Sequence, residues 1–140
     1  MKWHWNAVLI DDDESINLIH RIILKKAFPK IEVEEFTDPV AAIEHFEALT
    51  ELHERTIIFL DLNMPELNGF EFLERFNNLR EKIKGRVFIY VLTASQAERD
   101  KERVKRSGMI QAYLNKPLTN DTVYSIDNKV SLMQKVDALR

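Results

Sequence analysis

Four short apolar runs in the sequence are each followed by side chains that could do chemistry. Asp11 and Asp12 follow the first run, Asp61 follows a second, Thr93 a third, and Lys116 lies just past a fourth. In a parallel sheet, sites form at the carboxyl ends of the strands, beside a switch in strand order. If these runs are strands of one such sheet, three carboxylates, a hydroxyl and an ammonium meet at one rim.

The three carboxylates at this rim would repel one another, so either one takes a proton or a cation neutralises them. Ligands that are all oxygen suit a hard cation such as Mg²⁺ (or Mn²⁺), which binds one or two carboxylates together with a substrate phosphate. A phosphoryl group could share that ion with Lys116 and accept a hydrogen bond from Thr93. A carboxylate can also attack phosphorus and form an aspartyl phosphate. Asp61 is the candidate nucleophile, because it ends the central strand and is followed by a loop rather than by a second acid.

The elements that would position these residues follow from the hydrophobic pattern. Short apolar runs alternate with longer amphipathic stretches, which is typical of a parallel sheet covered by helices on both faces. Strands are expected at 7–10, 31–36, 57–60, 87–92 and 109–114. Helices are expected from the acidic run at 11–14 to about residue 27, over 39–49, 69–83 and 96–106, and from 119 or 120 onward. We therefore expect an α/β fold with a doubly wound five-stranded parallel sheet, as one domain over 1–140 with a core over about 6–137 and no output domain.

The expected helices differ in the apolar residues they offer to a core. Asp38 followed by Pro39 is a typical helix start. In the helix expected after the first acidic run, the apolar residues at helical spacing are Ile16, Ile19, Ile23 and Ala27. In the helix over 96–106 the apolar residues are Ala97 and Val104. This charged helix is either a solvated face or a loosely held element that moves with Thr93.

Two aromatic and histidine patterns have plain structural interpretations. Trp3 and Trp5 alternate with Ala7, which favours an extended strand that packs them, and a contact patch for a partner is the alternative. The histidines lack the spacing of zinc ligands, so we expect structural or solvated roles for His4, His20, His45 and His53.

The composition limits the class of protein. The 140 residues are 45% hydrophobic, carry a formal net charge of −3 and contain no cysteine. A disordered chain, thiol catalysis and cysteine zinc sites are therefore excluded. The longest apolar runs fall short of the roughly 18 residues of a membrane span, and the mild acidity argues against a nucleic-acid-binding face. We expect a cytoplasmic protein without membrane or nucleic-acid partners.

Four motifs in the right order at the strand ends carry a resemblance to a known family. The sequence resembles the receiver domain of two-component response regulators, of the stand-alone chemotaxis-regulator kind, from about Ala7 to the last helix. The motifs are Asp11-Asp12, Asp61-Leu62-Asn63-Met64-Pro65 with Gly69, Thr93-Ala94, and Tyr113-Leu114-Asn115-Lys116-Pro117. The resemblance implies a flavodoxin-like (βα)5 fold.

The resemblance also implies a metal site and a phosphoacceptor. Asp61 would accept the phosphoryl group. Mg²⁺ would be held by Asp61, by Asp12 directly, by Asp11 partly through water, and by the backbone carbonyl of Asn63.

The remaining matched positions imply a switch. Thr93 and Lys116 would bind the phosphoryl oxygens, the bond before Pro117 would be cis, and the ring of Tyr113 would turn inward when Thr93 moves. Phosphorylation would shift the population of an active form at the face made by the helix over 96–106, the strand at 109–114 and the last helix.

The implied function is a phosphorylatable signalling domain rather than a metabolic enzyme. It would take the phosphoryl group from a sensor histidine kinase or phosphotransfer protein, catalyse its own phosphorylation and dephosphorylation, and bind a downstream protein through that face. The oligomeric expectation is a monomer or a weak homodimer.

Two other functions stay open. One is a receiver that is never phosphorylated and acts through protein contacts; the complete set of acids, Thr93 and Lys116 argues against it. The other is an aspartate-nucleophile phosphohydrolase, whose nucleophile follows the first strand in an Asp-x-Asp pattern. Here Asp61 follows the third expected strand and precedes Leu62-Asn63.

Overall fold

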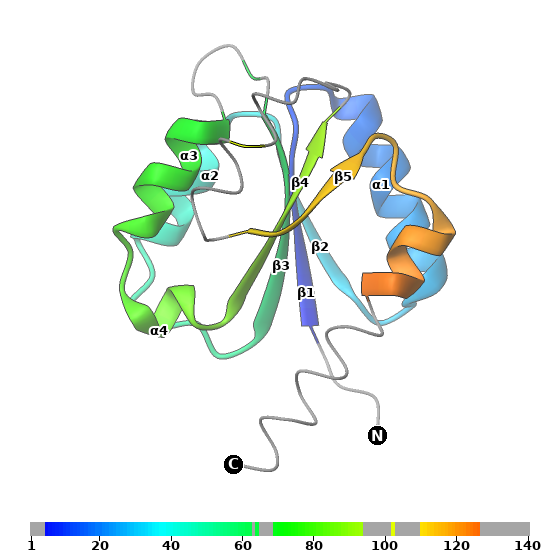
Figure 1. Cartoon of the computed structure of the whole chain (residues 1–140). Helices are drawn as coiled ribbons and strands as arrows, with labels where there is room; N and C mark the ends of the chain where they lie inside the picture. The colour runs from blue at the N-terminus through cyan, green and yellow to red at the C-terminus, as the bar shows by residue number, and fades with distance from the viewer. Residues whose placement is uncertain (1–4, 63, 65–68, 94–101, 103–109, 127–140) are drawn as a thin grey trace.

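The computed structural model describes residues 5–62, 64, 69–93, 102 and 110–126 (Figure 1). Five parallel strands form one sheet in the order β2-β1-β3-β4-β5. They are β1 (Trp5–Ile10), β2 (Glu32–Phe36), β3 (Arg55–Asp61), β4 (Val87–Thr93) and β5 (Ile110–Asn115). The chain passes outward from β1 to β2 and returns to the other side of β1 with β3, so the strand order switches between β1 and β3. The predicted five-stranded parallel sheet is confirmed.

Helices cover both faces of this sheet (Figure 1). On one face lie α1 (Glu14–Ala27) and a helix that begins at residue 120 and is described through 126. On the other face lie α2 (Pro39–Glu47), α3 (Gly69–Asn77) and the short α4 (Glu81–Lys84). In the described parts of the chain, every helix is too short or too polar to cross a membrane.

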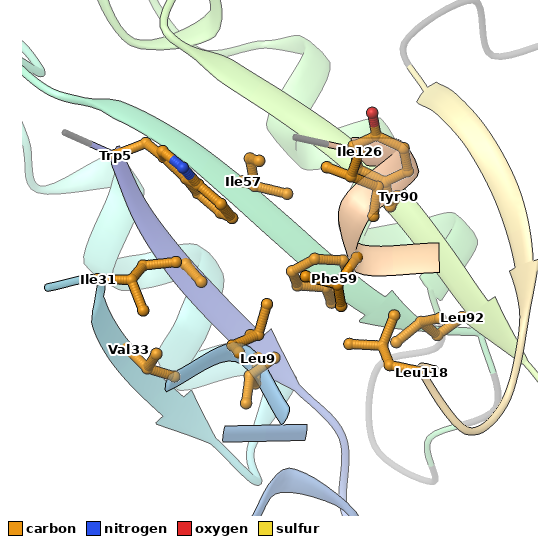
Figure 2. Packing of buried hydrophobic residues seen from close by; sticks show 13 residues of the cluster. Trp5, Leu9, Ile31, Val33, Ile57, Phe59, Tyr90, Leu92, Leu118 and Ile126 are labelled. Atoms are coloured by element: carbon orange, nitrogen blue, oxygen red, sulfur yellow. The ribbon is translucent and has the colours of Figure 1, made fainter. Parts of the chain in front are cut away.

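The central strands divide their apolar side chains between two cores because successive residues of a strand point to opposite faces. Leu9 and Phe59 belong to the core beneath α1, whereas Val8 and Leu60 belong to the core beneath α2 and α3. Figure 2 shows the first of these cores. Its residues of β1 include Trp5, which is 5% exposed. Trp5 is thus packed as the strand pattern predicts, and Trp3 lies outside the described residues.

The starts of two helices follow from their capping residues. The Asp13 carboxylate accepts from the backbone N–H groups of Ser15 and Ile16 at the start of α1. The Asp38 carboxylate accepts from Val40 N–H at 2.9 Å, with Pro39 as the first residue of α2. The predicted start at Asp38-Pro39 is confirmed, and each cap is worth about 1 kcal/mol.

The buried face of α1 differs in part from the predicted one. Ile19, expected at the apolar spacing, is 45% exposed. Ile23 and Ala27 are partly buried against the core as predicted, but the fully buried residues of α1 are Asn17, His20 and Leu24. Two polar side chains therefore occupy the inward stripe, because each finds a hydrogen-bond partner there that an isoleucine could not use.

The prediction of a single helix over 69–83 is wrong, because the structure has two helices there, α3 and α4. Asn78 N–H donates to the Arg75 carbonyl and Leu79 N–H to the Phe76 carbonyl, so α3 ends in a tight turn. Arg80 is then extended (φ −64°, ψ 148°) before α4 begins. Asparagine competes for backbone hydrogen bonds and favours such an ending at 77–78. Apart from Glu102, the helix expected over 96–106 lies outside the described residues, as does the expected last helix beyond residue 126.

Two cations of α1 reach the outer edge of β2. Arg21 donates from Nη2 to the Val33 carbonyl at 3.0 Å, and the Lys25 ammonium donates to the Ile31 carbonyl. The Phe36 carbonyl points the other way, toward β1, where it accepts from Asp11 N–H. Because strand carbonyls alternate in direction, those of Val33 and Ile31 belong to the open edge.

Gly69 lies against the turn that leaves β3. Its N–H donates to the Leu62 carbonyl at 2.9 Å. A Cβ at this position would lie 2.8 Å from Leu62 Cα and 2.9 Å from the Asp61 carbonyl oxygen. Because both are backbone atoms, the close approach of α3 to the end of β3 requires glycine.

We expect Gly69→Ala to lower the free energy of unfolding by about 1–3 kcal/mol through this overpacking, measured by urea unfolding. Gly85→Ala is the matched control, because a Cβ there would meet the Glu81 carbonyl oxygen at 3.0 Å at an exposed position. Its change should stay below about 1 kcal/mol. A Gly69→Ala protein as stable as the native one would contradict the close packing.

Candidate functional site

Three carboxylates meet at the switch in strand order. Asp61 ends β3, and Asp11 follows β1, whose last residue Ile10 pairs with Leu60. Asp12 comes next, and each of the three aspartates offers an oxygen within 4.8 Å of the others. Asp11 and Asp61 are 4% and 6% exposed, whereas Asp12 is exposed. Two of the three charges are therefore buried beside one another, where their repulsion needs compensation.

The Lys116 ammonium supplies that compensation. Its Nζ lies 2.5 Å from Asp11 Oδ2 and 3.3 Å from Asp61 Oδ2. Burial of Lys116 would lower its pKa, but the hydrogen bond to Asp11 and the charge of Asp61 outweigh burial and raise the pKa above its usual value. Lys116 therefore stays charged, and three carboxylates with one ammonium leave two negative charges at the site.

Thr93 and Tyr113 lie on the strands beside this cluster. Thr93 ends β4, is fully buried, and accepts from Lys116 N–H at 3.1 Å through its carbonyl. Tyr113 of β5 is half-buried and packs with Leu62 and Val91. The structure thus brings Asp11, Asp12, Asp61, Thr93 and Lys116 to one edge of the sheet.

Three neighbouring residues complete the description of the site. Asn63 lies outside the described residues. The Asp13 carboxylate caps α1 through Ser15 and Ile16, and its hydrogen bonds to the side chain and backbone of Ser15 lower its pKa. The Lys116–Pro117 peptide bond is cis, as the sequence motif implies.

Residues 7–126 match the family described as response regulator receiver domain. This stretch covers most of the chain. The protein belongs to that family. The molecule is thus a receiver domain of two-component signalling. Its doubly wound sheet is the flavodoxin-like fold predicted from the sequence.

Solved structures of receiver proteins are similar along nearly the whole chain. A two-component response regulator from Cytophaga hutchinsonii is 28% identical, with a TM-score of 0.79, covering 92% of this chain and 98% of that one. A response regulator receiver protein from Dyadobacter fermentans is 26% identical, with a TM-score of 0.80, covering 87% and 94%.

A curated relative matches over a shorter stretch. The cyclic di-GMP phosphodiesterase response regulator RpfG of Xanthomonas campestris pv. campestris is 31% identical over 74 residues. These are 53% of this chain and 18% of that protein, so the receiver domain spans a small part of the relative's length.

Asn17 of this receiver domain supports the acidic cluster and was not predicted from the sequence. Its Nδ2 donates to the carbonyls of Asp11, at 3.1 Å, and Phe36, at 3.3 Å. The side chain is 1% exposed, and its Oδ1 has no hydrogen-bond partner among the described residues. The Asn17 amide therefore joins the carboxyl ends of β1 and β2 and fixes the backbone of Asp11. An asparagine one turn into the helix that follows an acidic motif is the sequence signal that could have found it.

His20, one helical turn further along α1, holds the other side of the site. Its Nε2 accepts from the backbone N–H of Leu118 at 3.2 Å, just after Pro117. The ring is 2% exposed, and burial lowers its pKa from 6.5 to about 4. His20 therefore stays neutral at pH 7. Among the two sequence interpretations, a structural role fits this residue and a solvated one does not.

The lowered pKa of His20 predicts a loss of stability in acid. Because the folded pKa, about 4, lies below the unfolded value of 6.5, this contribution is complete above pH 6.5 and is lost as the pH falls toward 4. We expect His20 to remove about 2 kcal/mol of unfolding free energy between pH 8 and pH 5.

Urea unfolding at a series of pH values measures this contribution. The pH-dependent loss in His20→Gln should be smaller than the native loss by that amount. His53→Gln removes a histidine whose side chain is 82% exposed, and it should follow the native curve. Parallel curves for His20→Gln and the native protein would refute the assignment.

Proposed function

We propose that this receiver domain accepts a phosphoryl group on Asp61 from the phosphohistidine of a histidine kinase or phosphotransfer protein, with Mg²⁺, and that phosphorylation changes which proteins its surface binds. The observation that carries the proposal is the Lys116 ammonium between Asp11 and Asp61. A cation so placed can stabilise the charge of an arriving phosphoryl group. The family match supports the same function.

The positions of the strands favour Asp61 as the nucleophile. It ends the central strand β3, with Asp11 beyond neighbouring β1 and Thr93 at the end of neighbouring β4. Asp11 has both oxygens engaged, Oδ2 by Lys116 and Oδ1 by the Asp13 N–H at 3.0 Å. Both oxygens of Asp11 are thereby fixed in direction, which suits a supporting carboxylate that would hold a cation.

The proposed transfer is a single displacement at phosphorus. A carboxylate oxygen of Asp61 forms the new O–P bond as the N–P bond of phosphohistidine breaks, and the imidazole leaves with the electron pair and takes a proton from water. The Lys116 ammonium and the Thr93 hydroxyl bind phosphoryl oxygens and thereby stabilise the negative charge that develops on them during transfer.

The donor set fits a hard divalent cation. Its side-chain ligands are all oxygen, lie within 4.8 Å of one another, and leave two negative charges after Lys116 is counted. Asp11, Asp12 and Asp61 would hold Mg²⁺ together with the carbonyl of Asn63, and the ion would neutralise charge on the phosphoryl oxygens.

Thr93 and Tyr113 would transmit the effect of phosphorylation from the site to the partner-binding face. The Thr93 carbonyl bonds Lys116 N–H, so a shift of Thr93 toward a phosphoryl group also acts on the end of β5. Tyr113 on that strand packs against Val91 of β4. We propose that phosphorylation shifts the population between two arrangements of these residues and of the downstream-binding face.

Incubation with acetyl phosphate and Mg²⁺ tests the phosphoacceptor. Intact mass spectrometry should show the gain of one phosphoryl group on the native protein and none on Asp61→Asn. Asp38→Asn, which alters a helix-capping carboxylate, is the matched control and should gain the group. Lack of a gain on the native protein, or a gain that survives Asp61→Asn, would overturn the proposal.

Removal of the Lys116 charge tests the metal site. The native protein should gain about 1.4 kcal/mol of stability when Mg²⁺ is tenfold above its Kd. Lys116→Met leaves three carboxylates uncompensated, so it should bind Mg²⁺ more tightly and gain more at the same concentration. Lys82→Met, on the exposed side of α4, should behave as the native protein. Thermal unfolding with and without Mg²⁺ measures the difference, and equal gains in Lys116→Met and the native protein would contradict the charge argument.

A further inference from the structure

We propose that His20 is a positioning residue for phosphoryl transfer, which acts by holding the turn that carries Lys116. His20 touches none of the reacting groups in the proposed mechanism. Its contact is with the backbone of Leu118, two residues beyond the lysine. The expected effect on the phosphorylation rate rests on the proposed function. The positioning of the turn by His20 rests on the geometry alone.

The turn after β5 is anchored on both sides of Lys116. At Lys116 itself, the backbone N–H donates to the Thr93 carbonyl at 3.1 Å. Two residues later, Leu118 N–H donates to His20 Nε2 at 3.2 Å. Pro117, between them, has no N–H to offer. The first bond ties the turn to the sheet, and the second ties it to α1.

The Leu118 side chain secures the same point. It is 2% exposed and lies in the core with Leu9 and Phe59 (Figure 2). Its backbone N–H is therefore in a place that water does not readily reach, where an unpaired donor is costly. The acceptor on α1 satisfies this donor and fixes the direction in which the turn leaves β5.

A neutral imidazole suits this place. It has one ring nitrogen that accepts and one that donates, so acceptance at Nε2 puts the proton on Nδ1. Leucine has a similar bulk but no acceptor, whereas glutamine carries an acceptor oxygen on a side chain of comparable reach. The pair His20→Leu and His20→Gln therefore separates the hydrogen bond from the filling of space.

The position of the turn matters because the Lys116 ammonium must contact two carboxylates at once. The Lys116 ammonium lies at 2.5 Å from Asp11 and 3.3 Å from Asp61, at the end of a flexible four-carbon stem. If the backbone of Lys116 shifts, the ammonium can keep one carboxylate and lose the other. Misplacement of a positioned group by about 1 Å can cost up to about a hundredfold in rate.

The kinetic test compares three variants at saturating Mg²⁺ and acetyl phosphate, at a temperature where all are folded by circular dichroism. His20→Leu should phosphorylate about tenfold more slowly than the native protein. His20→Gln should recover most of that rate. Leu24→Ala, which removes a fully buried side chain of the same helix, should lose stability and keep the native rate. A native rate in His20→Leu, or an equal loss in Leu24→Ala, would overturn the proposal.

A second measurement needs no phosphorylation. In ¹⁵N-labelled protein at pH 7.5, His20 should carry its proton on Nδ1, and the Lys116 ammonium should give a signal that shifts or broadens in His20→Leu but not in Leu24→Ala. If the native protein takes no phosphoryl group, the proposed function fails and this comparison still decides the positioning. An unchanged Lys116 signal in His20→Leu would refute it.

Discussion

Asp11 and Asp61 lie buried beside one another, and their like charges must be compensated inside the protein because water reaches them poorly. The Lys116 ammonium contacts both, so one residue of the turn after β5 has to reach across β4 to the ends of β1 and β3. The parallel register makes this reach possible, since Asp61 pairs with Leu92 and Thr93 pairs with Asn115. A slip of one residue in either pairing would move the ammonium away from the carboxylates.

The backbone groups around this charged cluster explain why α1 buries polar side chains. A helix that packed on the sheet with apolar residues alone would leave the carbonyls of Asp11 and Phe36, and the N–H of Leu118, without side-chain partners at the site. Asn17 and His20 meet these groups from one stripe of the helix, three residues apart, while Leu24 continues the stripe into the core. The helix thus both packs on the sheet and hydrogen-bonds the backbone around the charged cluster.

The sequence predicted the sheet well, because four-residue apolar runs such as Ile57–Leu60 have few alternatives to a buried strand. It also predicted the residues at the rim, since strand ends are defined by abrupt changes from apolar to polar. The inward face of α1 was not predictable in this way. Ile19 looks like a core residue by its type, and His20 becomes one through a backbone amide 98 residues away in the chain. The break between α3 and α4 is local in sequence, but asparagine at 77–78 only weakens a helix, and the tight turn after α3 and the extended Arg80 before α4 complete the break.

The cations that α1 places over the outer edge of β2 bear on how this domain meets other chains. An edge strand ordinarily offers a row of acceptors on which a foreign strand can hydrogen-bond. Here the Val33 and Ile31 carbonyls are already bonded by Arg21 and Lys25. An incoming strand would have to displace two charged donors and would meet their positive charge at once. This edge is therefore protected against sheet extension and the aggregation that follows from it, so a partner strand cannot readily add to the sheet beside β2.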